Sequence, residues 1–135
     1  IAYAHLFSYF RGEEWRTQKE TQRLLDKYFT TKPNGIPGND DTGTMSAWAI
    51  FNMIGFYPDC PGLPEYTLTT PVFNKVTIRL DPKWYKEKEL VIESNRTQPG
   101  TLYINKVLLN GKKFNQYRIT HDELVHSQRI LFDLK

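Results

Sequence analysis

The sequence of 135 residues predicts an α+β fold, in which a helical first part is followed by a β-rich second part. Apolar residues recur at helical spacing up to residue 54, whereas short β-rich runs separated by turn residues fill the chain after Gly62. We therefore divide the chain into a helical region, 1–62, and a β-rich region, 63–135. An outer helix followed by a buried one further predicts alternating layers, as in an α-solenoid or toroid.

Composition excludes several classes of protein. The net charge of +3 arises from 18 basic and 15 acidic residues that are dispersed along the chain, so no basic arm for nucleic acid is present. No run approaches the roughly 20 apolar residues that a membrane-spanning helix needs. Because 39% of the residues are hydrophobic and 14% are aromatic, we expect a packed globular core.

Three helices are predicted in the first part. The chain begins inside a helical pattern, 1–10, without an initiator methionine or a capping residue, as expected for a piece of a longer protein. His5 lies on this apolar helix, where a packed core histidine is a more common role than a ligand. Residues 14–29 form a helix with a polar face, which places it on the outside. Residues 45–54 are apolar at nearly every angle, so this helix should be packed on most sides.

The run Gly38-Asn39-Asp40-Asp41-Thr42-Gly43 stands directly before the apolar helix. The unpaired N–H groups and the positive dipole of the helix start favour an ionised carboxylate there. An ionised carboxylate can take a proton from water or bind a cation. Asp, Asn and Thr before a helix are also common caps, and either Thr42 or Asp41 could cap the first turn. Spacing alone leaves both interpretations open.

The β-rich region contains several predicted strands: 66–68, 72–80, 89–94, 101–109, 116–120 and 129–134. Asn110-Gly111 between two of these runs is a strong hairpin-turn signal. Thr120 precedes residues that resemble a single capped helical turn. Together these signals predict an antiparallel sheet or a small sandwich.

Other residues have structural and functional interpretations. His121 and His126 lie near a turn, and surface positions are favoured over a metal site. Trp48 could stack on a sugar, although a tryptophan in an apolar helix usually belongs to the core. Trp84-Tyr85 could be an exposed aromatic pair.

Several of these pieces together resemble the C-terminal part of the alpha-mannosidases of glycoside hydrolase family 92. The resemblance covers nearly the whole chain, and its most specific element is the run from Gly38 to Trp48. The pieces are Ile36-Pro37-Gly38-Asn39-Asp40-Asp41-Thr42-Gly43-Thr44-Met45-Ser46-Ala47-Trp48, Gly55-Phe56-Tyr57-Pro58, Pro61-Gly62, Glu65-Tyr66, Pro71-Val72-Phe73, Lys75-Val76-Thr77-Ile78, Tyr103-Ile104, Leu109-Asn110-Gly111 and Ile119-Thr120-His121.

The resemblance implies an exo-acting, calcium-dependent, inverting alpha-mannosidase that hydrolyses the alpha-mannosidic linkages of glycans. Residues 1–62 would then be the last helices of an (α/α)6 toroid, and the partners would be a mannose-containing glycan and the remainder of the parent polypeptide. An inverting enzyme needs a general acid and a general base that are about 6.5–9.5 Å apart. The family's general acid lies upstream, so we expect the isolated 135 residues to be inactive. An extracytoplasmic location is also inferred from the family.

Site roles follow from the same resemblance. Asp41 matches the general base, and Asp40 is a second candidate catalytic carboxylate that could also contact Ca²⁺, which takes oxygen ligands. Asn39 stands where other members carry a further carboxylate. Asn39 and Trp48 are therefore our candidate substrate-binding residues. The alternative function is a non-catalytic carbohydrate-binding or structural β module, in which aromatic residues stack on a glycan.

Overall fold

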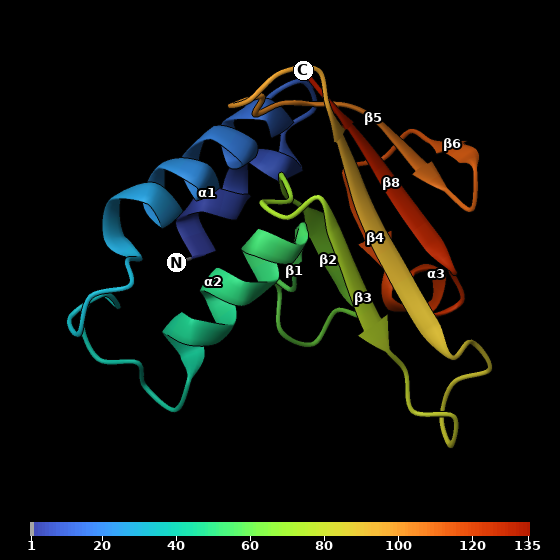
Figure 1. Ribbon diagram of the computed structural model, residues 1–135, viewed down its shortest axis with the longest axis horizontal. Coiled ribbons are helices and arrows are strands. Elements are labelled where there is room, and N and C mark those ends of the chain that lie inside the picture. Colours follow the sequence, from blue (N-terminus) through green and yellow to red (C-terminus); the bar gives the residue numbers. More distant parts are fainter. Residues whose placement is uncertain (1) are drawn as a thin grey trace.

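The computed structural model describes residues 2–135 and places the longer helices on one side of the molecule and the sheets on the other (Figure 1). The helices are the 3-10 helix η1 (Ala2–Tyr9), α1 (Glu14–Tyr28), α2 (Thr44–Ile54) and the short α3 (His121–Val125). The strands are β1 (Phe56–Tyr57), β2 (Glu65–Leu68), β3 (Lys75–Arg79), β4 (Glu89–Arg96), β5 (Ile104–Leu109), β6 (Lys112–Phe114), β7 (Arg118–Thr120) and β8 (Arg129–Leu134). The mixed α+β class expected from the sequence is confirmed.

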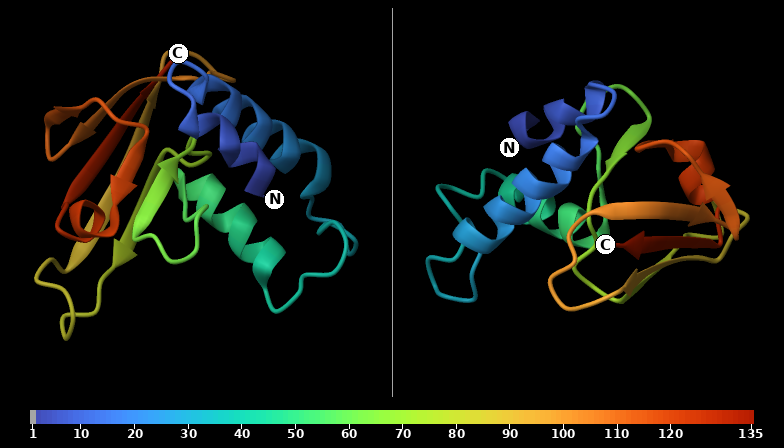
Figure 2. Two further views of the ribbon diagram at one scale, coloured as in Figure 1. Left: turned by 180° about the vertical axis from the view of Figure 1, so that it is seen from behind. Right: turned by 90° about the horizontal axis from the view of Figure 1, so that it is seen from above.

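The strands form two sheets that share one hydrophobic core. Their orders are β1-β2-β7 and β3-β4-β8-β5-β6, seen from two sides in Figure 2. The core contains Leu68 and Ile119 from the small sheet, and Ile92, Ile130 and Phe132 from the large one. Burying these apolar faces against each other is the main stabilising contribution to this half of the chain.

The prediction of a wholly antiparallel sheet is wrong at one pair of strands. β4 and β8 run parallel, with Ile92 opposite Ile130, and β8 lies between β4 and β5. Both strands bury alternate residues, so their apolar faces point toward the same core. A parallel pair requires a long connection, and the chain from β4 to β8 supplies it with the β5–β6 hairpin, β7 and α3.

Two local predictions in the β-rich region are confirmed. Asn110 (φ 50°) and Gly111 (φ 80°) both adopt left-handed angles and join the antiparallel strands β5 and β6, as in a type I′ turn. The Thr120 hydroxyl accepts a hydrogen bond from the Glu123 N–H, while the Glu123 carboxylate accepts one from the Thr120 N–H. This reciprocal capping box starts α3.

Helix α1 lies on the outside, as predicted, but its buried side is largely polar. Thr17, Gln18 and Thr21 are buried together with Leu25. Gln18 crosses to the large sheet, where its side-chain oxygen accepts a hydrogen bond from the Ile104 N–H at 2.9 Å. Directional polar contacts therefore hold this helix in place as well as apolar packing.

Helix α2 packs on most of its sides, as predicted. Phe51 and Ile54 pack against the core of the sheets, and Met53 packs against the cluster around Trp48. Trp48, Ala49 and Asn52 are buried, but Ile50 is 58% exposed. The buried side contacts η1, since the His5 ring nitrogen Nε2 lies 2.9 Å from Asn52 Oδ1. The exposed stripe of this helix consists of Thr44, Ala47 and Ile50.

The predicted boundary between residues 62 and 63 is crossed by contacts of several kinds. Strand β1 pairs with β2, so the small sheet begins before the boundary. The Thr69 N–H donates to the Gly55 carbonyl, and Phe51 of α2 packs against the core of the sheets. The two regions therefore pack as continuous neighbours.

Candidate active site

The acidic run forms a tight loop that leads into α2. Asp41 (φ 44°), Thr42 (φ 63°) and Gly43 (φ 85°) are three consecutive residues with left-handed backbone angles. Such angles are unfavourable for a β-branched residue such as Thr42 and persist only where the surrounding structure imposes them. The constraint here comes from Thr44, whose hydroxyl donates to the Asp41 carbonyl at 2.7 Å, and from the side chain of Asp40.

Asp40 caps α2. One carboxylate oxygen accepts a hydrogen bond from the Ser46 N–H at 2.8 Å, and the other accepts one from the Ser46 hydroxyl at 2.7 Å. These bonds to Ser46 lower the pKa of Asp40, so its carboxylate is ionised at neutral pH. The prediction that Thr42 or Asp41 supplies the cap is therefore wrong. Asp41 and Thr42 lie in the left-handed turn, and Gly43, which has no side chain to donate or accept, stands at the cap position.

Asp41 and Asn39 are both exposed. Within residues 2–135, no hydrogen bond or ion pair engages the Asp41 carboxylate, whereas its backbone is fixed by Thr44. The loop thus combines one anchored carboxylate with a neighbouring carboxylate that is free to act on an external group.

Trp48 lies in the core, 2% exposed. Its ring stacks on Phe29 with centroids 5.4 Å apart and meets His5 and Tyr57 edge to face. These neighbours enclose the indole, which gives Trp48 the packing role and leaves no open face for a sugar. The cavity beside it, about 90 Å³, is also well below the size of ordinary ligand pockets.

The candidate calcium ligand Asp40 is present, but residues 2–135 do not by themselves gather the acidic side chains of a calcium cage. No group of three or more His, Cys, Asp or Glu side chains is placed to hold a metal ion among the residues that the structure describes. Ca²⁺ takes six to eight oxygen ligands, and both oxygens of Asp40 already bind Ser46. Asp40 could supply at most a small part of such a site.

The histidines have three different environments. His5 is fully buried and stacks on Tyr57 with centroids 4.5 Å apart, which confirms the core prediction. His126 is exposed, as predicted, and pairs with Asp122. His121 lies only partly at the surface, because it is half-buried and its ring contacts the Tyr66 and Tyr85 hydroxyls at 2.9 and 3.4 Å.

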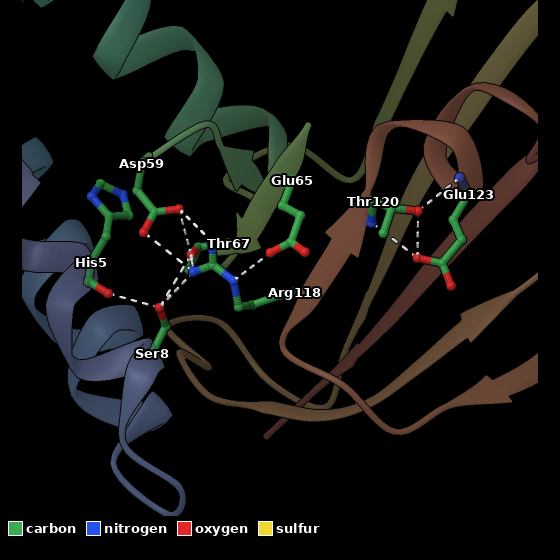
Figure 3. Close-up of polar contacts among 8 residues, drawn as sticks. All are labelled: His5, Ser8, Asp59, Glu65, Thr67, Arg118, Thr120 and Glu123. Atoms are coloured by element: carbon green, nitrogen blue, oxygen red, sulfur yellow. Dashed lines mark hydrogen bonds and ion pairs between the residues drawn. The ribbon is translucent and has the colours of Figure 1, made fainter. Parts of the chain in front are cut away.

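A polar cluster that the sequence did not reveal is centred on Arg118 of β7 (Figure 3). Its guanidinium lies 3.2 Å from both the Asp59 and the Glu65 carboxylates, and it donates to the Thr67 hydroxyl at 2.8 Å. The guanidinium also lies over the Tyr9 ring, 4.4 Å from its centroid. Arg118 lies 51 to 59 positions from Thr67, Glu65 and Asp59, and these residues carry no motif, so no local signal predicts the cluster.

The Arg118 cluster joins η1 to the small sheet. Burial would raise the pKa of Asp59, but hydrogen bonds from Arg118, Tyr9 and Thr67 outweigh it and lower that pKa. Asp59 is therefore a paired structural carboxylate. No bound substrate is needed to explain it.

The profile of the family described as "Glycosyl hydrolase family 92 catalytic domain" matches residues 1–135. Two solved structures from Bacteroides thetaiotaomicron are similar over 99% of this chain: the GH92 alpha-mannosidase BT3965 in complex with mannoimidazole, with 30% identity and a TM-score of 0.89, and the GH92 inverting mannosidase BT2199, with 34% identity and a TM-score of 0.84.

A curated relative is an uncharacterized secreted glycosidase from Arthroderma benhamiae. It is 28% identical over 114 residues, which is 84% of this chain and 14% of that protein. This chain likewise covers 17% and 18% of the two solved relatives. The residues matched by the family profile span the whole sequence, and the fold agrees, so this chain belongs to glycosyl hydrolase family 92.

Proposed function

We propose that this chain is the C-terminal portion of a longer inverting alpha-mannosidase and that it supplies the general base for hydrolysis. Family membership and the similarity to two enzymes whose names say alpha-mannosidase or inverting mannosidase support the proposal. The observation that carries it is the free Asp41 carboxylate on a loop that its neighbours hold in one conformation.

In this proposal, Asp41 accepts a proton from a water molecule as that water attacks the anomeric carbon. The attack occurs on the face opposite the glycosidic oxygen, which is protonated by a general acid from outside this chain. A base must be ionised and accessible, and Asp41 is exposed and engaged by no other side chain of residues 2–135. Water attack from the opposite face inverts the anomeric configuration.

Asp40 is a positioning residue in this scheme. Its two bonds to Ser46 tie the loop to the first turn of α2 and so fix the backbone of the adjacent Asp41. Asn39 stays a predicted substrate contact, since its exposed amide can donate to and accept from sugar hydroxyls. Calcium dependence stays a prediction from the family resemblance.

Membership of the family also supports a proposal about the location and partners of the full-length enzyme. We place the full-length enzyme outside the cytoplasm, acting on a mannose-containing glycan, because its relative from Arthroderma benhamiae is called a secreted glycosidase. No helix among residues 2–135 is long and apolar enough to cross a membrane.

The substitution Asp41→Asn in the full-length enzyme tests the proposed base. Asn tolerates left-handed backbone angles, so the loop should keep its shape while the proton acceptor is lost. We expect kcat on an aryl alpha-mannoside to fall by about 10²- to 10⁴-fold. The first product of the unaltered enzyme, followed by NMR, should be beta-mannose.

Asp122→Asn is the matched control, because Asp122 is an exposed acid on α3 outside the loop. Its kcat should equal that of the unaltered enzyme. Activity of Asp41→Asn within a few-fold of the control would remove Asp41 as the base. Release of alpha-mannose as the first product would refute the inverting mechanism.

A further inference from the structure

A second cavity lies away from the acidic loop, between the start of α1 and the ends of β5 and β8. Its volume is about 410 Å³, within the usual range for small-ligand pockets. It is lined by residues of α1, of the strands and of the segment before β7: Trp15, Gln18, Tyr103, Ile104, Tyr117 and Lys135. Figure 1 shows the first turn of α1 near the C-terminus, with the start of α2 at the opposite end of the helical layer.

Three of the lining residues are aromatic. Trp15 is 41% exposed, and its ring meets that of Tyr103 edge to face with centroids 6.3 Å apart. Tyr117 is half-buried, and within residues 2–135 neither tyrosine hydroxyl has a hydrogen-bond partner. The cavity thus offers flat apolar surface together with unused polar groups.

Gln18 adds a fixed polar group. It is 2% exposed, and its Oε1 accepts the hydrogen bond from the Ile104 N–H, which sets the orientation of the amide. No described residue accepts a hydrogen bond from its Nε2, although the side chain lines the cavity. This nitrogen is not one of the fully buried donors that lack a partner, so it is accessible and can donate to a ligand or to water in the cleft.

We propose that this cleft is a non-catalytic site for one hexose unit of an alpha-mannoside, held by stacking on Trp15 and by hydrogen bonds to Gln18 Nε2 and the tyrosine hydroxyls. A pyranose has an apolar C–H face and a rim of hydroxyls, which matches an aromatic wall beside amide and hydroxyl groups. The choice of mannose rests on the proposed function. The site would hold a second unit of a long glycan while the acidic loop acts on its end.

The test uses the full-length protein and a sulfur-linked alpha-mannobiose, which the enzyme does not hydrolyse. Calorimetry on the unaltered protein should show two binding events per molecule. Trp15→Ala should lose one event or weaken it at least about fivefold, because the stacking surface is gone. Gln18→Glu keeps an acceptor for the Ile104 N–H but removes the donor, and it should weaken the same event.

Trp84→Ala is the matched control, since Trp84 is another exposed tryptophan that does not line this cleft. It should bind as the unaltered protein does, and thermal unfolding will verify that all variants are folded. Turnover of a small aryl mannoside by Trp15→Ala should be unchanged. Loss of the second binding event in Trp15→Ala, with turnover unchanged, would support the proposed sugar site in the cleft.

Three results would overturn the inference: a single binding event in the unaltered protein, equal binding by Trp15→Ala and the unaltered protein, or equal binding of a sulfur-linked glucose disaccharide at the second event. Absence of turnover in the unaltered protein would instead refute the proposed mannosidase function. The binding measurement does not need turnover, so the two failures are distinguishable.

Discussion

Replacing Arg118 by methionine tests how the helical layer is fastened to the small sheet. The change keeps much of the apolar stem but removes the cation that pairs with Asp59 and Glu65. The Asp59 side chain is 3% exposed, so Arg118→Met leaves a carboxylate buried without its partner. Breaking a buried pair in this way costs about 3–5 kcal/mol, and the 19% exposure of Arg118 places our expectation near 3 kcal/mol.

Arg129→Met is the control for this experiment. Arg129 pairs with Glu93 at 2.6 Å on the outer face of the large sheet, where its side chain is 58% exposed. Exposed pairs contribute about 0–1 kcal/mol, because water and salt screen them. The two variants remove the same kind of group, and they differ mainly in the burial of the carboxylate that remains.

The stability that the Arg118–Asp59 pair contributes should decrease as the pH falls. The folded-state pKa of Asp59 is lowered, so the pair contributes fully above the unfolded-state pKa of about 4 and is lost as pH falls through the folded value. In Arg118→Met, burial without the cation raises the Asp59 pKa. The stability gap between the two proteins should therefore be widest at neutral pH and close below about pH 4.

Hydrogen exchange followed by mass spectrometry can measure this effect in the peptides of β2 and β7. Opening free energies there should fall by about 3 kcal/mol in Arg118→Met and by less than about 1 kcal/mol in Arg129→Met. Equal losses in the two variants, or a gap that widens in acid, would refute the assignment of Arg118 and Asp59 as a buried structural pair.

Two further predictions concern the helical layer. Asp40→Ala should increase hydrogen exchange in the first turn of α2, because the N–H of Ser46 loses its acceptor; unchanged exchange there would exclude the cap. Gly55→Ala should lower the free energy of unfolding by about 2–4 kcal/mol, since φ is 119° and the new Cβ would meet the Pro71 ring at 2.8 Å, whereas Gly12→Ala, with open space, should cost about 1 kcal/mol. Equal denaturant midpoints for the two glycine variants would count against the steric argument.

Local patterns predicted much of the fold because their causes are local. The β-rich run 72–80 predicted a strand, and the structure forms β3 there from Lys75 to Arg79 with Val76 and Ile78 half-buried. Asn110-Gly111 predicted a hairpin turn because few other residues accept two successive left-handed angles. Thr120 predicted a helix start for the same kind of reason, since its partner Glu123 is three residues away.

Features that depend on contacts between distant residues could not be predicted from the sequence. The insertion of β8 between β4 and β5 is decided by packing across the core, and a run such as 129–134 fits a parallel or an antiparallel neighbour equally well. The polar character of the buried side of α1 could not be predicted either. Gln18 accepts its hydrogen bond only because the fold places Ile104 beside it. Arg118 and Asp59 form an ion pair although 59 positions separate them in the sequence, so no local pattern predicts it.

The acidic loop shows why adjacent residues of one type can take different roles. Asp40 and Asp41 carry the same side chain and both precede α2. The sequence alone therefore does not show which of them caps the helix. The left-handed path through Thr42 separates them, because it turns Asp40 back onto Ser46 and leaves Asp41 free. Glycine at position 42 would relieve the strain of about 1–3 kcal/mol but would also allow the loop many other paths. The base role that we propose for Asp41 requires its carboxylate to meet one water at one face of a sugar, which a loop with a single path allows.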